Sequence, residues 1–252
     1  MLLGAVTYNV LKDMDLETVI QTLEKAGFGG VELRTTHKHG VEPSLSAAER
    51  EKVKQRFERS KVRLLSFGTT CEFHSADPEV RRKQVEEGKR FVVLAHDTGA
   101  YGVKVRPNGF AKEVSHEQTI ANIGACLREL GEFGQGYGVE IWLEVHGRET
   151  QVPDVAAAIM KATRHNQVGL CWNSNPTDVV NGSVTQNFNL LRPWIKSCHI
   201  NELVSGYPYR ELFALMRKTK YDRWTLCECG ESPQPDRFLS YYRALWVELN
   251  RA

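Results

Sequence analysis

The sequence predicts an α/β fold, one closed (β/α)8 barrel that spans residues 1–252. Strand-like apolar runs alternate with amphipathic helical runs, and the eight resulting pairs match the number in a closed barrel. The length of 252 residues suits one such barrel with short loops. Polar residues repeatedly close the strand-like runs, as expected when parallel strands end at one shared mouth. Because no linker or low-complexity segment interrupts this pattern, we expect a single TIM-barrel domain.

Each expected strand is a short, mainly apolar run bounded by turn residues. The strands are expected near residues 2–8, 29–34, 62–68, 100–106, 139–146, 167–173, 195–201 and 223–229. Between them, apolar residues recur with the spacing of one helix face. The helices are expected near residues 15–26, 46–60, 77–98, 116–136, 153–164, 184–191, 209–219 and 235–250.

Helix start and stop signals agree with these positions. Ser or Asp side chains can accept a hydrogen bond from the first free N–H groups of a helix, and glycine tolerates the left-handed conformation that ends one. The signals are capping boxes at Ser46/Glu49 and Ser115/Gln118, an Asp77-Pro78 start, and helix ends at Gly27 and Gly99.

Composition limits the partners and the compartment. The chain has 33 Lys and Arg against 31 Asp and Glu, a net charge of +2 that does not favour nucleic acid or a membrane as a partner. The N-terminal segment lacks a basic signal-peptide region, and no apolar run approaches the ~18 residues of a membrane span. We therefore expect a cytoplasmic protein whose six cysteines are reduced, buried thiols rather than disulfides or zinc ligands.

Polar pairs spaced i, i+2 close six of the strand-like runs, and side chains with this spacing project from one face of a strand. The pairs are Glu32/Arg34, Glu72/His74, Lys104/Arg106, Glu144/His146, Asn173/Asn175 and His199/Asn201. A seventh run ends in a lone carboxylate, Glu228. This repetition predicts an enzyme whose site is assembled from the ends of many strands.

The strongest group consists of Glu144, Asn173, His199 and Glu228, which close four consecutive expected strands. Two carboxylates, one imidazole and one amide oxygen suit a divalent metal such as manganese, magnesium, cobalt or zinc. The alternative is a buried ion-pair network between the histidine and the glutamates. We favour the metal site because lone carboxylates are rarely buried unpaired.

Other polar residues near the same strand ends are candidates for substrate binding. They are His74, Lys104, Arg106, His146, Arg148, Asn175 and Arg210. Lys104 and Arg106 suit a phosphate, a carboxylate or an enediolate, but they could equally neutralise Glu72 and Glu144. Aromatic candidates for a wall against a sugar ring are Tyr8, Phe67 and Tyr207.

Four segments, taken in order and spacing, resemble the xylose-isomerase-like TIM-barrel superfamily over nearly the whole chain. They are Gly29-Gly30-Val31-Glu32-Leu33, Trp142-Leu143-Glu144-Val145-His146-Gly147, Ser197-Cys198-His199-Ile200 and Cys227-Glu228-Cys229. This superfamily includes sugar isomerases, ketose 3-epimerases, hydroxypyruvate isomerases, inosose dehydratases and endonuclease IV.

In the epimerase branch, Glu, Asp, His and Glu hold a metal, and the resemblance places these roles on Glu144, Asn173, His199 and Glu228. It also implies that Glu144 and Glu228 are the catalytic acid and base on opposite faces of the substrate. The implied function is a metal-dependent isomerase or epimerase that moves a proton in a small carbohydrate or keto-sugar through an enediolate. A homo-oligomer is also compatible with this resemblance.

The sequence departs from that pattern on the sixth strand, where Asn173 replaces the metal-binding aspartate and Pro176 replaces a frequent histidine. The lost negative charge predicts weaker metal binding unless another carboxylate, such as Glu202, contributes. A metal-free or non-catalytic carbohydrate-binding barrel, and a keto-sugar dehydratase or lyase, remain alternatives. An endonuclease IV-like DNA repair enzyme is disfavoured because Pro176 and Asn201-Glu202 stand where its additional metal ligands are expected.

Overall fold

Eight parallel strands close into a barrel in chain order, with β8 paired to β1. The computed structural model describes residues 1–251. The strands are β1 (Leu2–Val6), β2 (Gly30–Arg34), β3 (Arg63–Glu72), β4 (Gly102–Arg106), β5 (Glu140–Glu144), β6 (Val168–Trp172), β7 (Ile195–Ile200) and β8 (Trp224–Cys227). The predicted (β/α)8 fold is therefore confirmed.

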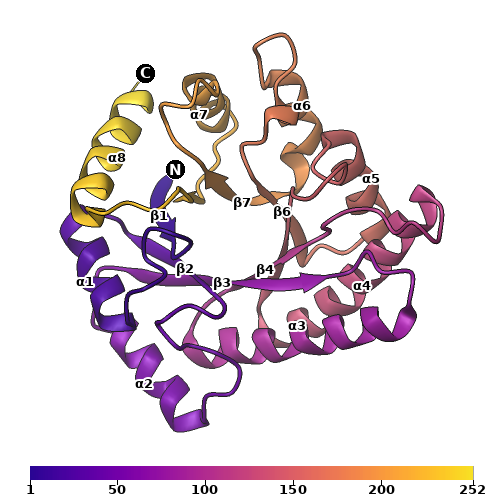
Figure 1. Ribbon diagram of the computed structural model, residues 1–252, viewed down its shortest axis with the longest axis horizontal. Helices are drawn as coiled ribbons and strands as arrows, with labels where there is room; N and C mark the ends of the chain where they lie inside the picture. The colour runs from indigo at the N-terminus through magenta and orange to yellow at the C-terminus, as the bar shows by residue number, and fades with distance from the viewer. Residues whose placement is uncertain (252) are drawn as a thin grey trace.

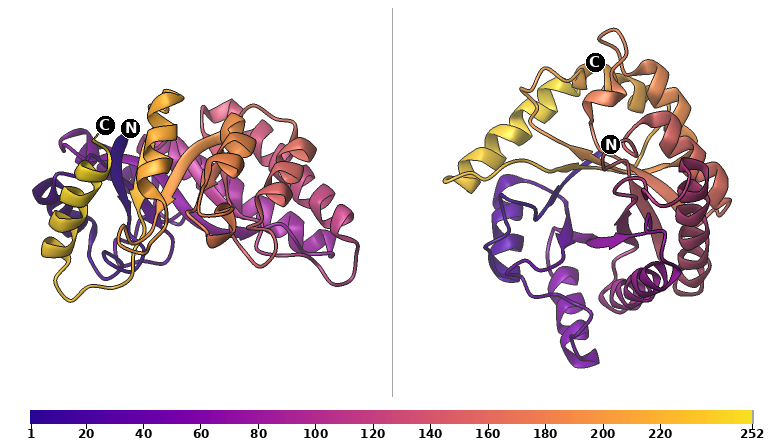
Figure 2. Two further views of the ribbon diagram at one scale, coloured as in Figure 1. Left: turned by 90° about the horizontal axis from the view of Figure 1, so that it is seen from above. Right: turned by 45° about the vertical axis from the view of Figure 1, so that its right-hand side comes forward.

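The helices form an outer ring around the strands (Figure 1), and the turned views in Figure 2 show the same enclosure. They are α1 (Leu16–Ala26), α2 (Ala47–Glu58), α3 (Pro78–Thr98), α4 (His116–Tyr137), α5 (Pro153–Thr163), α6 (Thr185–Leu191), α7 (Tyr209–Lys218) and α8 (Pro235–Leu249). Two short 3₁₀ helices, η1 (Pro176–Asp178) and η2 (Arg192–Trp194), flank α6.

Each of the expected capping signals lies at a helix end. Ser46 makes a complete capping box with Glu49, whereas Ser115 accepts only the backbone half of its predicted box, from Gln118. Asp77 accepts from the Glu79 N–H at the start of α3. Both predicted glycine ends adopt the left-handed conformation, with φ of 75° at Gly27 and 81° at Gly99.

Strand β3 is longer than predicted, because it ends at Glu72 rather than near residue 68. After a register shift between Gly68 and Glu72, the strand pairs again with β4 through Glu72 and Arg106. Other strands end slightly earlier than predicted, so that His146, Asn173 and Asn201 lie just beyond them. These polar residues are therefore on loops at the mouth.

Within the barrel, a layer of apolar side chains lies below the charged groups at the mouth. Near the base, Val6, Leu65 and Leu226 form a small buried cluster, separate from the main core between strands and helices. Trp142 fills the space over Gly102, where an added Cβ would lie 2.5 Å from the indole ring. Because side chains alternate along a strand, the next inward positions toward the mouth carry polar groups.

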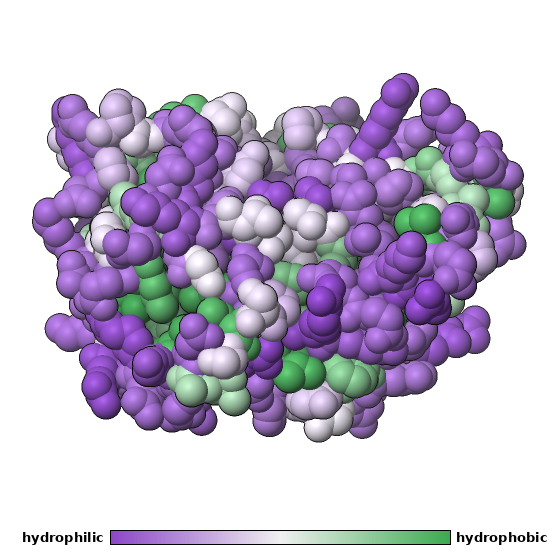
Figure 3. Space-filling view, turned by 60° about the horizontal axis from the view of Figure 1, so that its bottom comes forward, coloured by the Kyte–Doolittle hydropathy of each residue, from purple (hydrophilic) through white to green (hydrophobic). Residues whose placement is uncertain are grey.

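The outer surface shown in Figure 3 is mainly hydrophilic, with a smaller hydrophobic area toward the lower left of that view. Exposed large apolar side chains are scattered over strands, loops and helices. They are Leu2, Tyr8, Val80, Val152, Val180, Val204 and Tyr241. Among residues 1–251, no helix has the length and apolar character needed to cross a bilayer.

Candidate active site at the mouth of the barrel

A polar cavity of about 150 Å³ lies at the C-terminal ends of the strands. It is lined by Tyr8, Arg34, Lys104, Arg106, Glu144, His146, Asn173 and Glu228. In (β/α)8 enzymes this end of the barrel holds the active site. The chain therefore presents three cations and two carboxylates, together with neutral donors and acceptors, at the position where chemistry is expected.

His199 of β7 lies beneath this cavity, fully buried among three carboxylates. Its Nδ1 is 3.2 Å from Glu228 Oε2 and 3.6 Å from Glu144 Oε1, and its Nε2 is 3.3 Å from Glu32 Oε1. Neither ring nitrogen makes a hydrogen bond of good geometry. Although burial opposes ionisation, the Cys171 sulfur and the nearby carboxylates raise the pKa of His199 well above its usual value.

Lys104 and Glu144 form a buried ion pair, with 2.5 Å between Nζ and Oε2. Burial disfavours the charged form of both groups, but the attraction between the two opposite charges outweighs this effect. The lysine holds the pKa of Glu144 well below its usual value, and Glu144, Glu32 and Glu228 raise the pKa of Lys104. The pair uses Oε2, so Oε1 of Glu144 remains directed at His199.

Glu32 of β2 is the third carboxylate at His199, and its participation was missed as a site role from the sequence. It is fully buried and accepts a hydrogen bond of 2.8 Å from Ser66. A Cβ at Gly68 would lie 2.7 Å from Glu32 Oε1, so glycine leaves room for this carboxylate. The Glu32/Arg34 pair at the end of the second strand was the signal that could have identified it.

The donor atoms fit a divalent metal. Glu144, His199 and Glu228 each offer a ligand atom, and all three atoms lie within 4.8 Å of one another. Asn173 Oδ1 and His199 Nδ1 are buried without hydrogen-bond partners, as expected of ligand atoms. The Glu228 N–H donates to Ile200 O at 2.9 Å, which fixes this residue just beyond β8. These residues could therefore hold a cation, with Asn173 as an additional oxygen donor.

Glu202 does not join this group. It lines a separate cavity with Pro176 and Tyr207, between the loops that follow β6 and β7. Glu32, rather than Glu202, is the additional carboxylate nearest His199.

The outer wall of the cavity is a hydrogen-bonded network on the β3, β4 and β5 sides. Glu72 Oε1 accepts from Arg106 Nη2 at 2.7 Å and from Asn108 Nδ2 at 2.8 Å. Asn108 Oδ1 lies 3.1 Å from His146 Nδ1. Burial and the nearby Lys104 and Arg106 charges lower the pKa of His146, although Glu144 opposes this shift. The network leaves His146 neutral, with its side chain lining the cavity.

Four of the residues predicted to bind substrate lie outside the cavity lining. Arg148 and Arg210 are exposed on the loop after β5 and at the start of α7. Asn175 donates to Val145 O at 2.6 Å, which ties the loops after β5 and β6 together. His74 is half-buried beyond β3. The structure brings together Lys104, Arg106 and His146, the other three.

Of the aromatic candidates for a sugar wall, only Tyr8 lines the cavity. Phe67 is buried in the core against Phe91, and the Tyr207 hydroxyl donates to Asp178.

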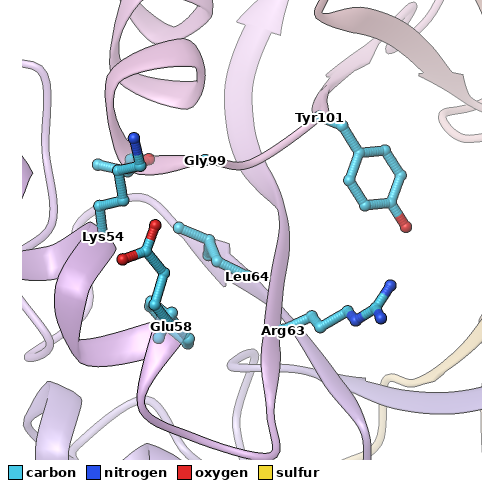
Figure 4. Close-up of a pocket in the computed structure, with 8 residues that line it drawn as sticks. Lys54, Glu58, Arg63, Leu64, Gly99 and Tyr101 are labelled. Carbon is cyan, nitrogen blue, oxygen red and sulfur yellow. The ribbon is translucent and has the colours of Figure 1, made fainter.

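A third cavity, of about 270 Å³, lies at the opposite end of the barrel, where β3 begins and α3 ends. In Figure 4, Lys54 and Glu58 of α2 stand on one side of it, and Arg63 and Tyr101 stand on the other. It lies at the N-terminal end of the strands, where conserved features of this fold serve stability rather than catalysis. The smaller cavity at the mouth is therefore the candidate active site.

Comparison with known proteins agrees with this fold. A family model described as xylose isomerase-like TIM barrel matches residues 20–241. D-psicose 3-epimerase from Clostridium cellulolyticum H10, solved with D-tagatose, has a TM-score of 0.85 at 13% identity, covering 100% of both chains. The IolI protein, solved with a bound zinc atom, has a TM-score of 0.77 at 17% identity, covering 99% of this chain and 96% of the other.

A third solved structure is the probable 3-DHS dehydratase AsbF from Bacillus anthracis. It has a TM-score of 0.79 at 14% identity and covers 100% of both chains. At these identities the likenesses establish the shared fold. No curated protein matches the sequence.

Proposed function

The chain belongs to the xylose isomerase-like TIM-barrel family, and from this premise we propose that it is a metal-dependent sugar isomerase or epimerase. The observation that carries the proposal is that Glu144 and Glu228 both line the polar cavity and both lie close to His199 Nδ1, which makes no hydrogen bond. Its substrate is a small carbohydrate or keto-sugar.

The two carboxylates supply the proton chemistry. One removes a proton from the carbon beside the substrate carbonyl, and the other returns a proton to the resulting enediolate. Glu228 is the better placed to exchange protons, because its side chain is 14% exposed and no lysine or arginine pairs with it within residues 1–251. Glu144 is held ionised by Lys104. A divalent metal held by Glu144, Asn173, His199 and Glu228 would polarise the carbonyl.

Besides holding Glu144 ionised, Lys104 can take part in this reaction directly. Its ammonium group lines the cavity beside Glu144, where it can stabilise negative charge that develops on the substrate. His146, neutral and held by Asn108, can orient a hydroxyl group.

The names of structurally similar proteins support carbohydrate chemistry. They include D-psicose 3-epimerase with D-tagatose, L-ribulose 3-epimerase and 3-keto-D-glucoside 4-epimerase. The likeness to the probable 3-DHS dehydratase supports a related alternative, because removal of the same type of proton also begins an elimination.

A metal-free carbohydrate-binding barrel is the second candidate, and two observations favour it. Lys104 already supplies a buried positive charge next to Glu144, and Asn173 removes a negative charge from the expected ligand set. The Lys104 charge and the missing carboxylate at Asn173 both weaken the attraction of the site for a metal cation.

The test begins with calorimetric titration of manganese and zinc into chelator-treated protein and into the Glu228→Gln variant. Candidate keto-sugars are then incubated in D₂O and deuterium uptake beside the carbonyl is followed by NMR. We expect metal binding that weakens in the variant and exchange that the variant loses. Arg59→Gln, an exposed change at the end of α2, is the control. No metal uptake and no exchange would overturn the proposal.

A further inference from the structure

We propose that Arg34 and Arg106 form an anion-binding subsite, so that the substrate is a short keto- or hydroxy-compound with a carboxylate or phosphate end group. This inference rests on the proposed function, because it places the anionic end relative to the carboxylates that would carry out proton transfer.

Arg34 has the charge and the free donors that such a subsite needs. It lies at the mouth end of β2 and lines the cavity. Its guanidinium carbon is 5.0 Å from the centroid of the Tyr8 ring, a cation–π contact that holds the group in place. Within residues 1–251, no carboxylate lies within 4 Å of it and its guanidinium donates no hydrogen bond to the protein. An arginine held in place with free donors is suited to a bidentate anion.

Arg106 adds a second set of donors from β4. Its Nη2 is used by Glu72, but its Nε is buried without a partner. Glu72 Oε1 also accepts from Asn108. A buried, unpartnered N–H is unfavourable unless a ligand accepts from it. Arg106 therefore has a donor that a bound anion would satisfy.

The distribution of charge gives the substrate a direction. Lys104 is paired with Glu144 and Arg106 with Glu72, whereas Arg34 has no acidic partner among the described residues. The arginines belong to β2 and β4, while Glu144 and Glu228 come from β5 and the end of β8. An anionic group at the arginines would leave the carbonyl end of the molecule toward the two glutamates.

The size of the cavity limits the length of the substrate. About 150 Å³ is well below the ~300–1,000 Å³ that is typical of pockets for drug-sized ligands. The space suits a short chain with one charged end better than a disaccharide.

The experiment compares three probes that differ in one end group: D-glycerate, glycerol 3-phosphate and glycerol. Binding is measured by calorimetry with and without chelator treatment, on the unchanged protein and on Arg34→Gln, Arg34→Lys, Arg106→Gln and Arg59→Gln. We expect at least one anionic probe to bind at least tenfold more tightly than glycerol. That preference should fall at least tenfold in Arg34→Gln and in Arg106→Gln, survive in part in Arg34→Lys, and persist in Arg59→Gln.

Whichever anionic probe binds more tightly identifies the end group as carboxylate or phosphate. Equal binding of all three probes, or an unchanged preference in a folded Arg34→Gln protein, would overturn the subsite. Thermal unfolding of each variant confirms that it is folded. Because binding is measured without turnover, an absence of deuterium exchange would count against the proposed function and leave this result intact.

Discussion

Charged side chains lie at both ends of the barrel, but their hydrogen-bonding groups are satisfied differently at the two ends. At the base, Glu140 accepts hydrogen bonds from Arg223 and from Trp142 Nε1 at 2.8 Å, and Lys196 Nζ lies 3.1 Å away. At the mouth, His199 and Asn173 have buried polar atoms without partners. An unsatisfied buried group costs roughly 1–3 kcal/mol.

This difference distinguishes a structural network from a functional one. Arg223 lies across the Trp142 ring, with its guanidinium carbon 5.7 Å from the ring centroid, and ties the start of β8 to β5. No side-chain nitrogen or oxygen of Glu140, Trp142, Lys196 or Arg223 is buried without a hydrogen-bond partner. At the mouth, buried polar atoms lack protein partners, and we expect a metal and a substrate to be the partners of those atoms.

The largest effect is expected for Glu228→Gln at the mouth. Loss of the proton-transferring carboxylate should lower the turnover number by about 10²–10⁴-fold, the usual contribution of general acid–base catalysis. The free energy of unfolding should change little, because this carboxylate belongs to a crowded acidic cluster. Deuterium exchange and urea unfolding would be measured together, and full activity in the variant would refute the assigned role.

Lys104→Met should destabilise the metal-free protein by about 3–5 kcal/mol, because it leaves Glu144 buried without its cation. A divalent metal should restore much of this loss by supplying another positive charge. Thermal unfolding with and without manganese tests both parts. Lys54→Met, at the cavity of Figure 4, is the matched control, since Lys54 makes no ion pair within residues 1–251. A loss that manganese does not reduce would contradict a metal at Glu144.

Glu140→Gln tests the opposite end of the barrel. The variant should lose about 1–3 kcal/mol of stability, because Arg223 and Lys196 would lack their shared partner in a partly exposed setting. Turnover at the remote mouth should be unchanged. Glu58→Gln, an exposed residue, serves as the control in urea unfolding. A large loss of turnover in folded Glu140→Gln would end the proposed separation of roles.

Asp178, in η1 beside the mouth, is intermediate between the satisfied network at the base and the unsatisfied groups at the mouth. Its Oδ2 is hydrogen-bonded, whereas its Oδ1 is buried without a partner. Burial raises its pKa from 3.8 to about 7, although hydrogen bonds from Tyr207 and Asn175 oppose the shift. The folded state therefore holds this proton more tightly than the unfolded state. Its stabilising contribution is complete below about pH 4 and is lost as the pH rises through 7.

Asp178→Asn should remove this pH dependence, which amounts to at most about 1.4 kcal/mol per pH unit. Urea unfolding at pH 5, 6, 7 and 8 measures it. Parallel curves for the variant and the unchanged protein would show that Asp178 does not titrate in this range.

The smallest effect is expected for Asn173→Asp, which adds one negative charge to the proposed ligand set. Metal affinity should increase by about tenfold, equivalent to about 1.4 kcal/mol. Calorimetric titration with manganese measures it, and Asn181→Asp, an exposed asparagine, controls for added charge elsewhere. An unchanged dissociation constant would remove Asn173 from the ligand set.

Much of the architecture was predictable because it depends on local patterns. The alternation of strand and helix patterns depends on residues that are neighbours in the chain. The same is true of the helix caps at Ser46 and Asp77 and the helix ends at Gly27 and Gly99, so these features could be predicted from the sequence. The largest departure at a strand end, in β3, arises from a second pairing with β4 that no local pattern encodes.

The site was predictable only in part. The i, i+2 pattern placed Glu144, His199 and Glu228 at strand ends, and the structure brings their ligand atoms together. The same pattern could not separate Asn175, which ties two loops together, from Asn173, which faces the cavity. It also did not show that Lys104 pairs with Glu144 while Arg34 remains free of acidic partners.

The sequence alone determined the barrel, the order of its elements and the supply of polar groups at the mouth, because periodicity and caps act over a few residues. The tertiary structure alone decided which charges are neutralised. Glu32 reaches His199 across the barrel, and Lys104 reaches Glu144 on the neighbouring strand. Those pairings depend on distances between strands that are far apart in the chain, and charge interactions in a buried site follow distance rather than sequence order.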